Sequence, residues 1–263
     1  MIGLVATDLD GTLVRSDGSV GERTRRALAR AEDAGIVVVF VTGRPLRWAR
    51  EVFEHVGSHG LAIVSNGALV WDVAADAPYL ERAIDPAVGL EVCALIRSAV
   101  PGSTFAVETA AAGIALEPEF LERHPVPDGA RRGPLEEILD APALKLLARH
   151  ERLAPQEFWD RAAAAVGDRA VITWSSATTL LEISAAGVTK ATTLALLAEQ
   201  HGLGPGQVAA FGDMPNDIPL LEWAGTSYAM ANAHPTVIAV ADRVVASNDD
   251  EGVAQVLEDL LAG

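Results

Sequence analysis

Two carboxylates stand two residues apart near the start of the chain, where Asp8-Leu9-Asp10-Gly11-Thr12 follows an apolar run. In an extended backbone, residues i and i+2 point to the same side, so Asp8 and Asp10 can converge on one point. Crowded carboxylates repel each other, and therefore one of them holds a proton or a cation lies between them. For so short a pattern on its own, an ordinary acidic turn after a strand is the alternative.

A second acidic cluster, from Gly212 to Asp217, follows the apolar run 208–211. Helical spacing would bring Asp213 and Asp217 to one face, and Asn216 adds another oxygen. Such oxygen ligands suit Mg²⁺, which binds a few carboxylates together with water and substrate phosphate. The same residues also form a helix-start pattern, with Asp213 as N-cap and a proline close behind it, and both interpretations can hold together.

Phosphate-binding groups are predicted at two further places. Thr42, Gly43 and Arg44 follow an apolar run and precede an amphipathic stretch, and such a junction offers a hydroxyl, free backbone amides and a helix N-terminus. Lys190 is one of two lysines, and every other residue counted as Lys or Arg is an arginine. A lysine kept at this position indicates that a compact ammonium is needed there, where a guanidinium would not fit. At a helix start it opposes the dipole unless an anion is near. An ordinary turn and a chance lysine are the alternatives.

The elements that must position these residues alternate apolar runs with amphipathic stretches. We predict strands at 2–7, 36–41, 61–64 and 208–211, an extended piece at 68–71, and helices at 22–34, 47–56, 191–200, 218–223 and from 253 onward. Strands without polar alternation belong in a parallel sheet covered by helices. The fold class is therefore α/β, with a doubly wound, mostly parallel, Rossmann-like sheet. Ligands bind at the carboxyl ends of such strands, where both acidic clusters stand.

The middle of the chain has a different pattern, with more proline and glycine breaks. We predict helices at 87–99 and 156–166 and half-exposed strands at 143–148, 170–174 and 180–184. A segment with its own helices and strands is typical of an inserted domain. The sequence thus predicts a smaller inserted α+β domain at 82–184 within a core formed by 1–81 and 185–263.

Composition narrows the possible partners. The 263 residues include 20 Lys+Arg and 36 Asp+Glu, a formal net charge of −16, which disfavours nucleic acids and anionic membranes but permits a small phosphorylated substrate. No apolar run is long enough to cross a membrane. Cys93 is the only cysteine, so no internal disulfide can form, and we expect it to pack as a buried hydrophobe in a cytoplasmic protein. The oligomeric state stays open.

Taken in order, the motifs resemble those of the haloacid-dehalogenase-like phosphatases. The resemblance covers the whole chain and lies in Asp8-Leu9-Asp10-Gly11-Thr12, Thr42-Gly43-Arg44, Lys190, and Gly212-Asp213 with Asn216-Asp217. Three stretches further resemble the Cof-type branch, which carries a large α/β cap between its second and third motifs: Asn66-Gly67-Ala68, Gly187-Val188-Thr189-Lys190 and Met230-Ala231-Asn232-Ala233.

This resemblance implies a Mg²⁺-dependent phosphatase that hydrolyses a small phosphorylated metabolite, a sugar phosphate or phosphorylated cofactor, through an aspartyl phosphate. It makes Asp8 the nucleophile, while Asp10 protonates the leaving oxygen and then activates water. The implied metal ligands are Asp8, the backbone carbonyl of Asp10, Asp213 and, in support, Asp217. The implied phosphate-binding residues are Thr42, Gly43, Lys190 and Asn216.

Two other functions are weighed against this one. A phosphosugar mutase would use the same core chemistry, and a phosphometabolite-binding module would lack turnover, against which the presence of both Asp8 and Asp10 argues. The second acid also disfavours dehalogenation. Within the predicted cap, Lys145 either extends to solvent or projects toward the leaving group. The most basic cap residues could recognise a second anionic group or lie in a solvated loop: Arg123, His124, Arg131 and Arg132.

Overall fold

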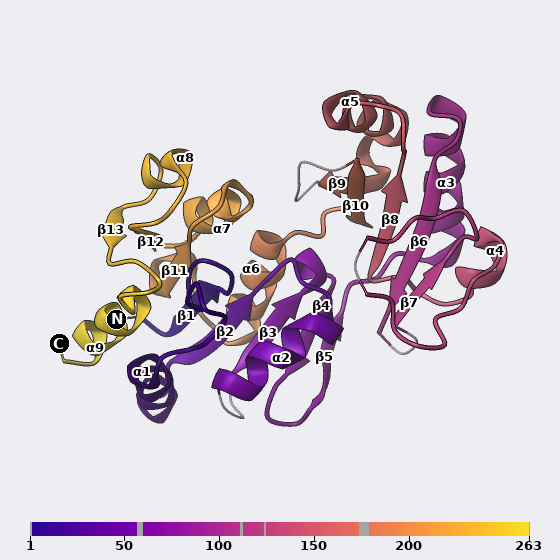
Figure 1. Cartoon of the computed structure of the whole chain (residues 1–263). Coiled ribbons are helices and arrows are strands. Elements are labelled where there is room, and N and C mark those ends of the chain that lie inside the picture. Colours follow the sequence, from indigo (N-terminus) through magenta and orange to yellow (C-terminus); the bar gives the residue numbers. More distant parts are fainter. Residues whose placement is uncertain (1, 57–59, 111–112, 124, 174–178, 263) are drawn as a thin grey trace. The chain divides into compact units, whose positions relative to one another are not determined.

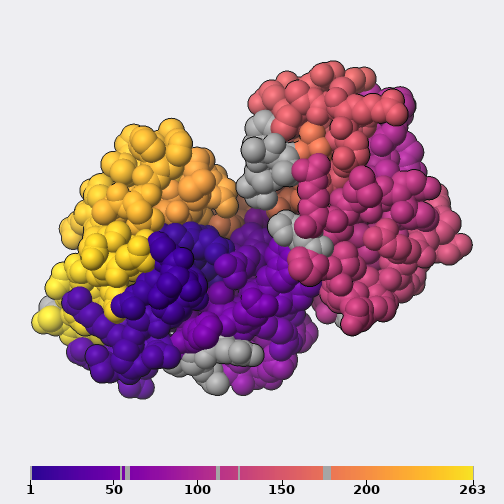
Figure 2. All heavy atoms as spheres, viewed as in Figure 1, coloured from indigo at the N-terminus to yellow at the C-terminus, as the bar shows by residue number. Residues whose placement is uncertain are grey.

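The chain folds into two compact units. The computed structural model describes residues 2–56, 60–110, 113–123, 125–173 and 179–262 (Figure 1). The core unit comprises Met1–Leu80 and Lys190–Gly263, and the inserted unit comprises Glu81–Thr189. In Figure 2 the core unit has the colours of the two ends of the scale, and the inserted unit has those of the middle.

An eight-stranded sheet forms the centre of the core unit. Its strands are β1 (Leu4–Asp8), β2 (Val37–Val41), β3 (Leu61–Val64), β4 (Leu69–Asp72), β5 (Ala77–Glu81), β11 (Val208–Gly212), β12 (Thr226–Met230) and β13 (Arg243–Val245). Their order is β13-β12-β11-β1-β2-β3-β4-β5. The pairs from β13 to β3 are parallel, whereas β3 and β4 are antiparallel. The predicted α/β class with a mostly parallel sheet is confirmed.

Helices accompany these strands in the alternation that the sequence predicts. They are α1 (Glu22–Asp33), α2 (Leu46–Val56), α6 (Lys190–Gln200), α7 (Ile218–Trp223), α8 (Pro235–Ile238) and α9 (Gly252–Ala262). In α1 the side chains of Ala27, Leu28 and Ala31 are buried, as expected for residues that share one helical face. The helix packs against α2 and α9, whereas α6 packs against α7.

Strand register brings three chemically important segments to one edge of the sheet. Thr7 of β1 lies beside Phe211 of β11, and Asp8 lies beside Val41 of β2. The strands are parallel, so the residues that follow β1, β2 and β11 leave the sheet at the same edge. All three strands are buried along most of their length, which explains their apolar sequences.

The inserted unit contains a separate antiparallel sheet. Its strands are β6 (Thr104–Thr109), β7 (Gly113–Leu116), β8 (Lys145–Arg149), β9 (Ala170–Thr173) and β10 (Leu180–Ala185), in the order β7-β6-β8-β10-β9. Its helices are α3 (Pro86–Ala99), α4 (Leu135–Ile138) and α5 (Pro155–Val166), and α3 packs against α5. The predicted α+β character is confirmed, although Trp174 of the predicted strand 170–174 lies outside the described residues.

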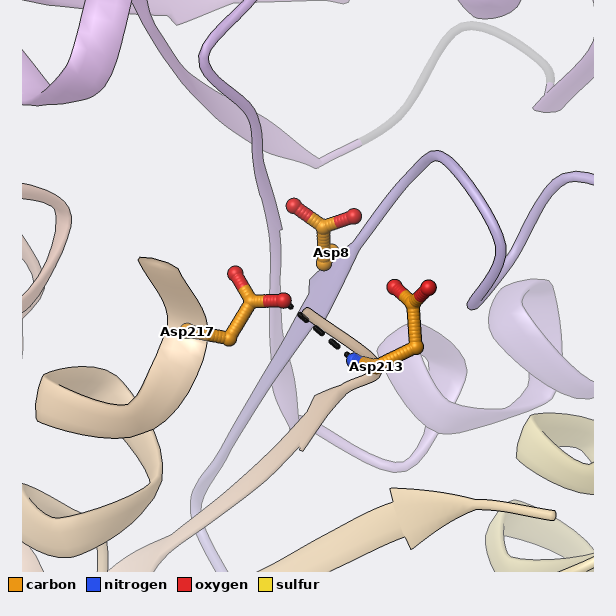
Figure 3. Close-up of side chains that lie close together, drawn as sticks. All are labelled: Asp8, Asp213 and Asp217. Carbon is orange, nitrogen blue, oxygen red and sulfur yellow. Dashed lines mark hydrogen bonds between the residues drawn. The ribbon is translucent and has the colours of Figure 1, made fainter. Parts of the chain in front are cut away.

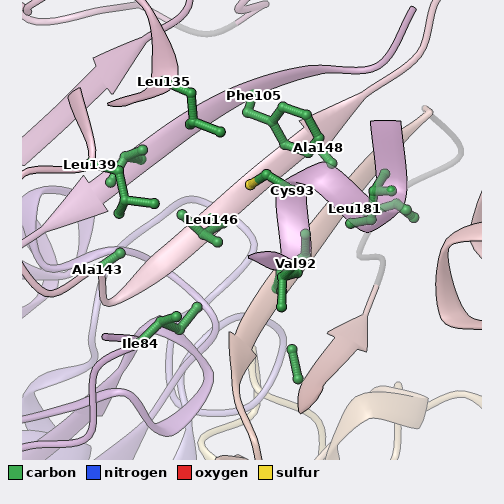
Figure 4. Close-up of a cluster of buried hydrophobic side chains, with 14 of the residues drawn as sticks. Ile84, Val92, Cys93, Phe105, Leu135, Leu139, Ala143, Leu146, Ala148 and Leu181 are labelled. Carbon is green, nitrogen blue, oxygen red and sulfur yellow. The ribbon is translucent and has the colours of Figure 1, made fainter. Parts of the chain in front are cut away.

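The hydrophobic core of the inserted unit lies between its sheet and its longer helices. Figure 4 shows Cys93 of α3 among side chains that include Phe105, Leu146 and Leu181 from three different strands. Cys93 is fully buried, and burial raises the pKa of its thiol above its ordinary value. It packs as a small hydrophobe, as the sequence predicts.

The prediction of half-exposed cap strands is wrong for β8. All five of its residues are buried. Leu146 faces the helix-covered core, while the charged residues on the opposite face are covered as well. The Nζ of Lys145 donates to Glu182 at 2.8 Å, and the guanidinium of Arg149 lies 5.5 Å from the ring centroid of Phe120. Neighbouring side chains therefore cover the polar face that the alternating pattern would leave open to solvent.

Candidate active site

Three carboxylates meet at the strand edge that the sheet register defines. Asp8 ends β1, Asp213 follows β11, and Asp217 ends the 3₁₀ turn Pro215–Asp217. One oxygen from each carboxylate lies within 4.8 Å of the others, and all three residues are buried (Figure 3). Asp8 of the first acidic cluster of the sequence and Asp213 and Asp217 of the second thus form one site.

Lys190 lies in direct contact with this acidic group. Its Nζ donates to Asp8 Oδ1 at 2.7 Å and to Asp217 Oδ1 at 2.9 Å, and the residue is 6% exposed. The lysine begins α6, where its charge opposes the helix dipole, so the two nearby anions explain how this position is tolerated. Three buried carboxylates share one ammonium, and when all are ionised the group is left with negative charge.

Glycines allow the two acidic loops to approach each other closely. Gly11 has a φ of 78°, and a Cβ at this position would lie 2.3 Å from Asp213 Oδ2. A Cβ at Gly212 would lie 2.7 Å from the Cβ of Asp217. The hydroxyl of Thr12 donates to Asp213 Oδ1 at 2.9 Å, which links the loop after β1 to the loop after β11.

The alternative interpretation of Asp213, as the N-cap of the following helix, is wrong. The 3₁₀ turn has Met214 at its N-cap, and the carboxylate of Asp213 accepts from Thr12 instead. Asp217 reaches back, and its Oδ2 accepts from the backbone amides of Asp213 at 3.3 Å and Met214 at 3.1 Å (Figure 3). Asp217 therefore holds the turn while its other oxygen contacts Lys190.

Burial and charge repulsion make ionisation costly at this site. Burial raises the pKa of Asp8 well above its usual range, and the charge of Asp217 adds to the effect. Burial likewise raises the pKa of Asp213 to about 6. Burial alone would lower the pKa of Lys190, but the charges of Asp8 and Asp217 outweigh it and raise that pKa. A cation added to the group would relieve the repulsion, so the residues present fit a divalent metal with oxygen ligands.

Asp10 is not one of the three carboxylates of this buried group. Its side chain is 54% exposed, and the guanidinium of Arg44 holds both of its oxygens: Nε donates to Oδ2 at 2.8 Å and Nη2 donates to Oδ1. The two acids that share the pattern after β1 thus occupy different surroundings, one buried beside a lysine and the other exposed beside an arginine.

The predicted phosphate-binding residues have different surroundings. Thr42 is buried directly after Val41, the β2 residue that lies beside Asp8, and its Oγ1 accepts from the amide of Arg44 at 3.0 Å. A Cβ at Gly43 would lie 2.7 Å from Asn66 Oδ1. Asn216 is exposed in the turn that ends at Asp217.

Three residues support this arrangement through side chains to which the sequence analysis assigned no role. They are Thr12, Arg44 and Asn232, whose Nδ2 donates to the carbonyl of Gly11 at 2.7 Å. Each of them belongs to one of the motifs described above, and this membership was the only sign in the sequence that their side chains support the site. Their partners lie far away in the sequence, so only the folded chain shows what the side chains contact.

The basic residues singled out in the predicted cap have partners in that unit. Arg131 pairs with Asp140 at 3.0 Å, and Arg123 lies 3.7 Å from Glu151. Nη1 of Arg132 donates to three backbone carbonyls. Lys145 is 2% exposed, so of the two alternatives for this residue the one in which it extends to solvent is wrong. His124 lies outside the described residues. Among the helices that the structure describes, none has the length and apolar character needed to span a membrane.

Comparisons with known proteins give full-length matches. A family model described as haloacid dehalogenase-like hydrolase matches residues 5–257. The 5-amino-6-(5-phospho-D-ribitylamino)uracil phosphatase YcsE of Bacillus subtilis is 27% identical over 264 residues, covering 97% of this chain and 94% of that protein. Phosphoglycolate phosphatase of Methanopyrus kandleri is 29% identical over 261 residues, which cover 99% of this chain and 98% of that protein. The crystal structure of SMU.1108c from Streptococcus mutans has a TM-score of 0.82 at 25% identity, and both chains are covered to 100%. Both units therefore have counterparts in these proteins.

Proposed function

The chain belongs to the haloacid dehalogenase-like hydrolase family and is a phosphatase of phosphoric monoesters, and we propose that it depends on Mg²⁺ and works through an aspartyl phosphate. The observation that carries the proposal is the buried group of Asp8, Asp213 and Asp217 with Lys190 between two of them. A phosphatase needs a nucleophile and positive charge near the phosphoryl oxygens, and this group offers both once a cation is bound.

The proposed metal ligands are Asp8, the backbone carbonyl of Asp10, and Asp213, with Asp217 as a further ligand or a support. Their buried carboxylates suit a hard divalent cation. When bound, Mg²⁺ supplies positive charge that offsets the negative charge of the substrate phosphate and of the acids.

The proposed reaction divides the work between the two acids that follow β1. An oxygen of Asp8 attacks phosphorus while the bond to the leaving oxygen breaks, and Asp10 gives its proton to that oxygen. Asp10 then takes a proton from water as the water oxygen bonds to phosphorus and the bond to Asp8 breaks. Free alcohol and phosphate result, and Asp10 is protonated again.

The remaining proposed site residues bind and orient the phosphoryl group. Thr42, Gly43 and Asn216 offer a hydroxyl, a backbone amide and a side-chain amide. Lys190 already contacts the nucleophile at 2.7 Å, and its ammonium is placed to stabilise the charge that spreads over the phosphoryl oxygens during transfer. We propose a sugar phosphate or a phosphorylated cofactor as the substrate, and the names of the similar phosphatases support a small phosphorylated metabolite.

Hydrolysis of para-nitrophenyl phosphate tests this proposal. Wild-type protein is expected to turn over with Mg²⁺ and to lose activity in EDTA, and Asp8→Asn should lower kcat by at least about 1,000-fold because it removes the nucleophile. Asp168→Asn, at an exposed position of the inserted unit, is the matched control and should retain full activity. Metal-independent turnover, or an active Asp8→Asn protein, would contradict the proposal.

A panel of phosphorylated metabolites, ranked by kcat/KM with Mg²⁺, would then identify the substrate class. The panel should include phosphoglycolate, phosphorylated sugars and phosphorylated ribityl compounds. Sugar 1-phosphates need a product analysis as well, in the presence of a sugar bisphosphate. Accumulation of free sugar and phosphate is expected for a phosphatase, whereas accumulation of sugar 6-phosphate would indicate a mutase.

A further inference from the structure

Arg44 is the side chain that holds Asp10. Among the described residues, the hydrogen-bond donors to the Asp10 carboxylate are Nε and Nη2 of Arg44, one to each oxygen. A guanidinium that donates two parallel hydrogen bonds fixes both the position and the plane of a carboxylate. Asp10 is 54% exposed, so without this partner its side chain would have several rotamers available to it.

Arg44 is itself fixed to the start of α2. Its amide donates to Thr42 Oγ1 at 3.0 Å, and its carbonyl accepts from the amide of Ser65 at 2.9 Å. At the far end of the side chain, Nη1 lies 3.5 Å from the carbonyl of Trp48. The guanidinium is therefore attached on one side to the helix and on the other to Asp10.

The backbone that carries Asp10 is held independently of Arg44. Asn232 donates to the carbonyl of Gly11, and Asn248 donates from its amide to Asn232 Oδ1 at 3.1 Å. Nδ2 of Asn248 donates to the carbonyl of Val14 at 2.8 Å. These bonds fix the backbone of the loop on both sides of its turn. They do not fix the side-chain rotamer of Asp10, which needs a further partner.

We propose that Arg44 is a positioning residue that orients Asp10 for proton transfer. The proposal rests on the acid and base role of Asp10 proposed above. A carboxylate offers about four lone-pair directions, and the arginine occupies two of them. The outer directions stay open to solvent and can hold the proton that passes to the leaving oxygen.

The expected consequence depends on the leaving group. An activated nitrophenolate departs without a proton, whereas an alkoxide from a sugar or another alcohol needs one as the bond to phosphorus breaks. Removing the orienting partner should therefore slow the hydrolysis of alkyl phosphates selectively. A residue that only stabilises the fold or binds the phosphoryl group would affect all esters equally, because every ester carries the same phosphoryl group.

The test measures kcat/KM for a series of phosphate monoesters that runs from an activated nitrophenol to unactivated alcohols. This parameter reports steps up to the first irreversible one, so it isolates the transfer to Asp8 from the later hydrolysis. For Arg44→Met we expect a loss of about 30-fold with alkyl esters and of less than about threefold with the activated ester. Arg50→Met is the matched control, because Arg50 stands in α2, the helix that Arg44 precedes, in an exposed ion pair with Asp76 at 2.7 Å, and it should change neither value.

Two reference variants separate the possible failures. Asp10→Asn should show the same selective loss with alkyl esters, and the loss should be larger. If Asp10→Asn shows no selective loss, the proposed role of Asp10 is wrong. If Asp10→Asn shows the selective loss and Arg44→Met does not, only the inference about Arg44 is overturned. The same holds if Arg44→Met loses activity equally with every ester. Arg44→Lys keeps the charge but lacks the two-pronged contact, so we expect partial recovery, and full recovery would overturn the orienting role.

Discussion

Replacement of Asp213 by asparagine is expected to stabilise the metal-free protein at neutral pH. The carboxyl is buried, and burial raises its pKa from 3.8 to about 6. Asparagine cannot ionise, yet its side-chain oxygen can still accept the hydrogen bond that Thr12 donates at 2.9 Å. The variant thus removes the cost of a buried negative charge with little change in shape.

The size and the pH dependence of this effect follow from the two pKa values. A raised pKa in the folded state means that folding is favoured while Asp213 is protonated and loses that advantage as pH rises through the range from 3.8 to about 6. A difference of about two pKa units corresponds to about 3 kcal/mol in the free energy of unfolding. Asp213→Asn should therefore match the wild type near pH 3, below both pKa values, and exceed it by up to about 3 kcal/mol above pH 7.

Calorimetry in EDTA at several pH values, with the transition of the core unit followed, provides the assay. Asp242→Asn is a control of opposite sign, because the backbone amide and hydroxyl of Ser227 donate to Asp242 and lower its pKa, so this variant should lose stability at neutral pH. Mg²⁺ at 100 times its Kd should stabilise the wild type by about 2.7 kcal/mol and Asp213→Asn by much less. An Asp213→Asn protein that is no more stable than the wild type above pH 7 would refute the reasoning.

Two further changes test the surroundings of the site. Lys190→Met leaves two buried acids without their ammonium partner, so thermal unfolding in EDTA should show a loss of about 3 kcal/mol at pH 8. The loss should be smaller at pH 5, where the acids can take up protons, and an equal loss at both pH values would contradict this. Gly11→Ala adds a Cβ 2.3 Å from Asp213 Oδ2 at a φ of 78°, so kcat should fall at least about tenfold in the phosphatase assay while the fold, checked by circular dichroism, is kept. Full activity would show that the loop can shift at no cost.

Sequence patterns predict the strands that carry the site because those strands are apolar on both faces and end in polar residues. Parallel strands share a carboxyl edge, so the meeting of Asp8 with Asp213 and Asp217 follows from the predicted topology. The contact of Lys190 with these acids needs the fold, since nothing in the local sequence places α6 beside β1.

Other features depend on partners that the local sequence does not name. The segment after β11 has two acids and a proline, which fits more than one helix start, and the long-range contact of Asp213 with Thr12 decides between them. Strand β8 is predicted to be half-exposed, and it has a charged residue at each end, but Glu182 of β10 pairs with Lys145. The sequence analysis does not predict five of the strands, because they are short or mixed in polarity: β5, β6, β7, β12 and β13.

The burial of Cys93 makes the chain suited to site-specific labelling. A thiol that is fully buried and whose pKa is raised reacts slowly with maleimides, so the native protein should give little background signal. A cysteine introduced at Arg26, on the exposed side of α1, and another at Leu121, which is 57% exposed in the inserted unit, would each accept a dye. Energy transfer between two such dyes would report the separation of the two units during turnover without first removing a native cysteine.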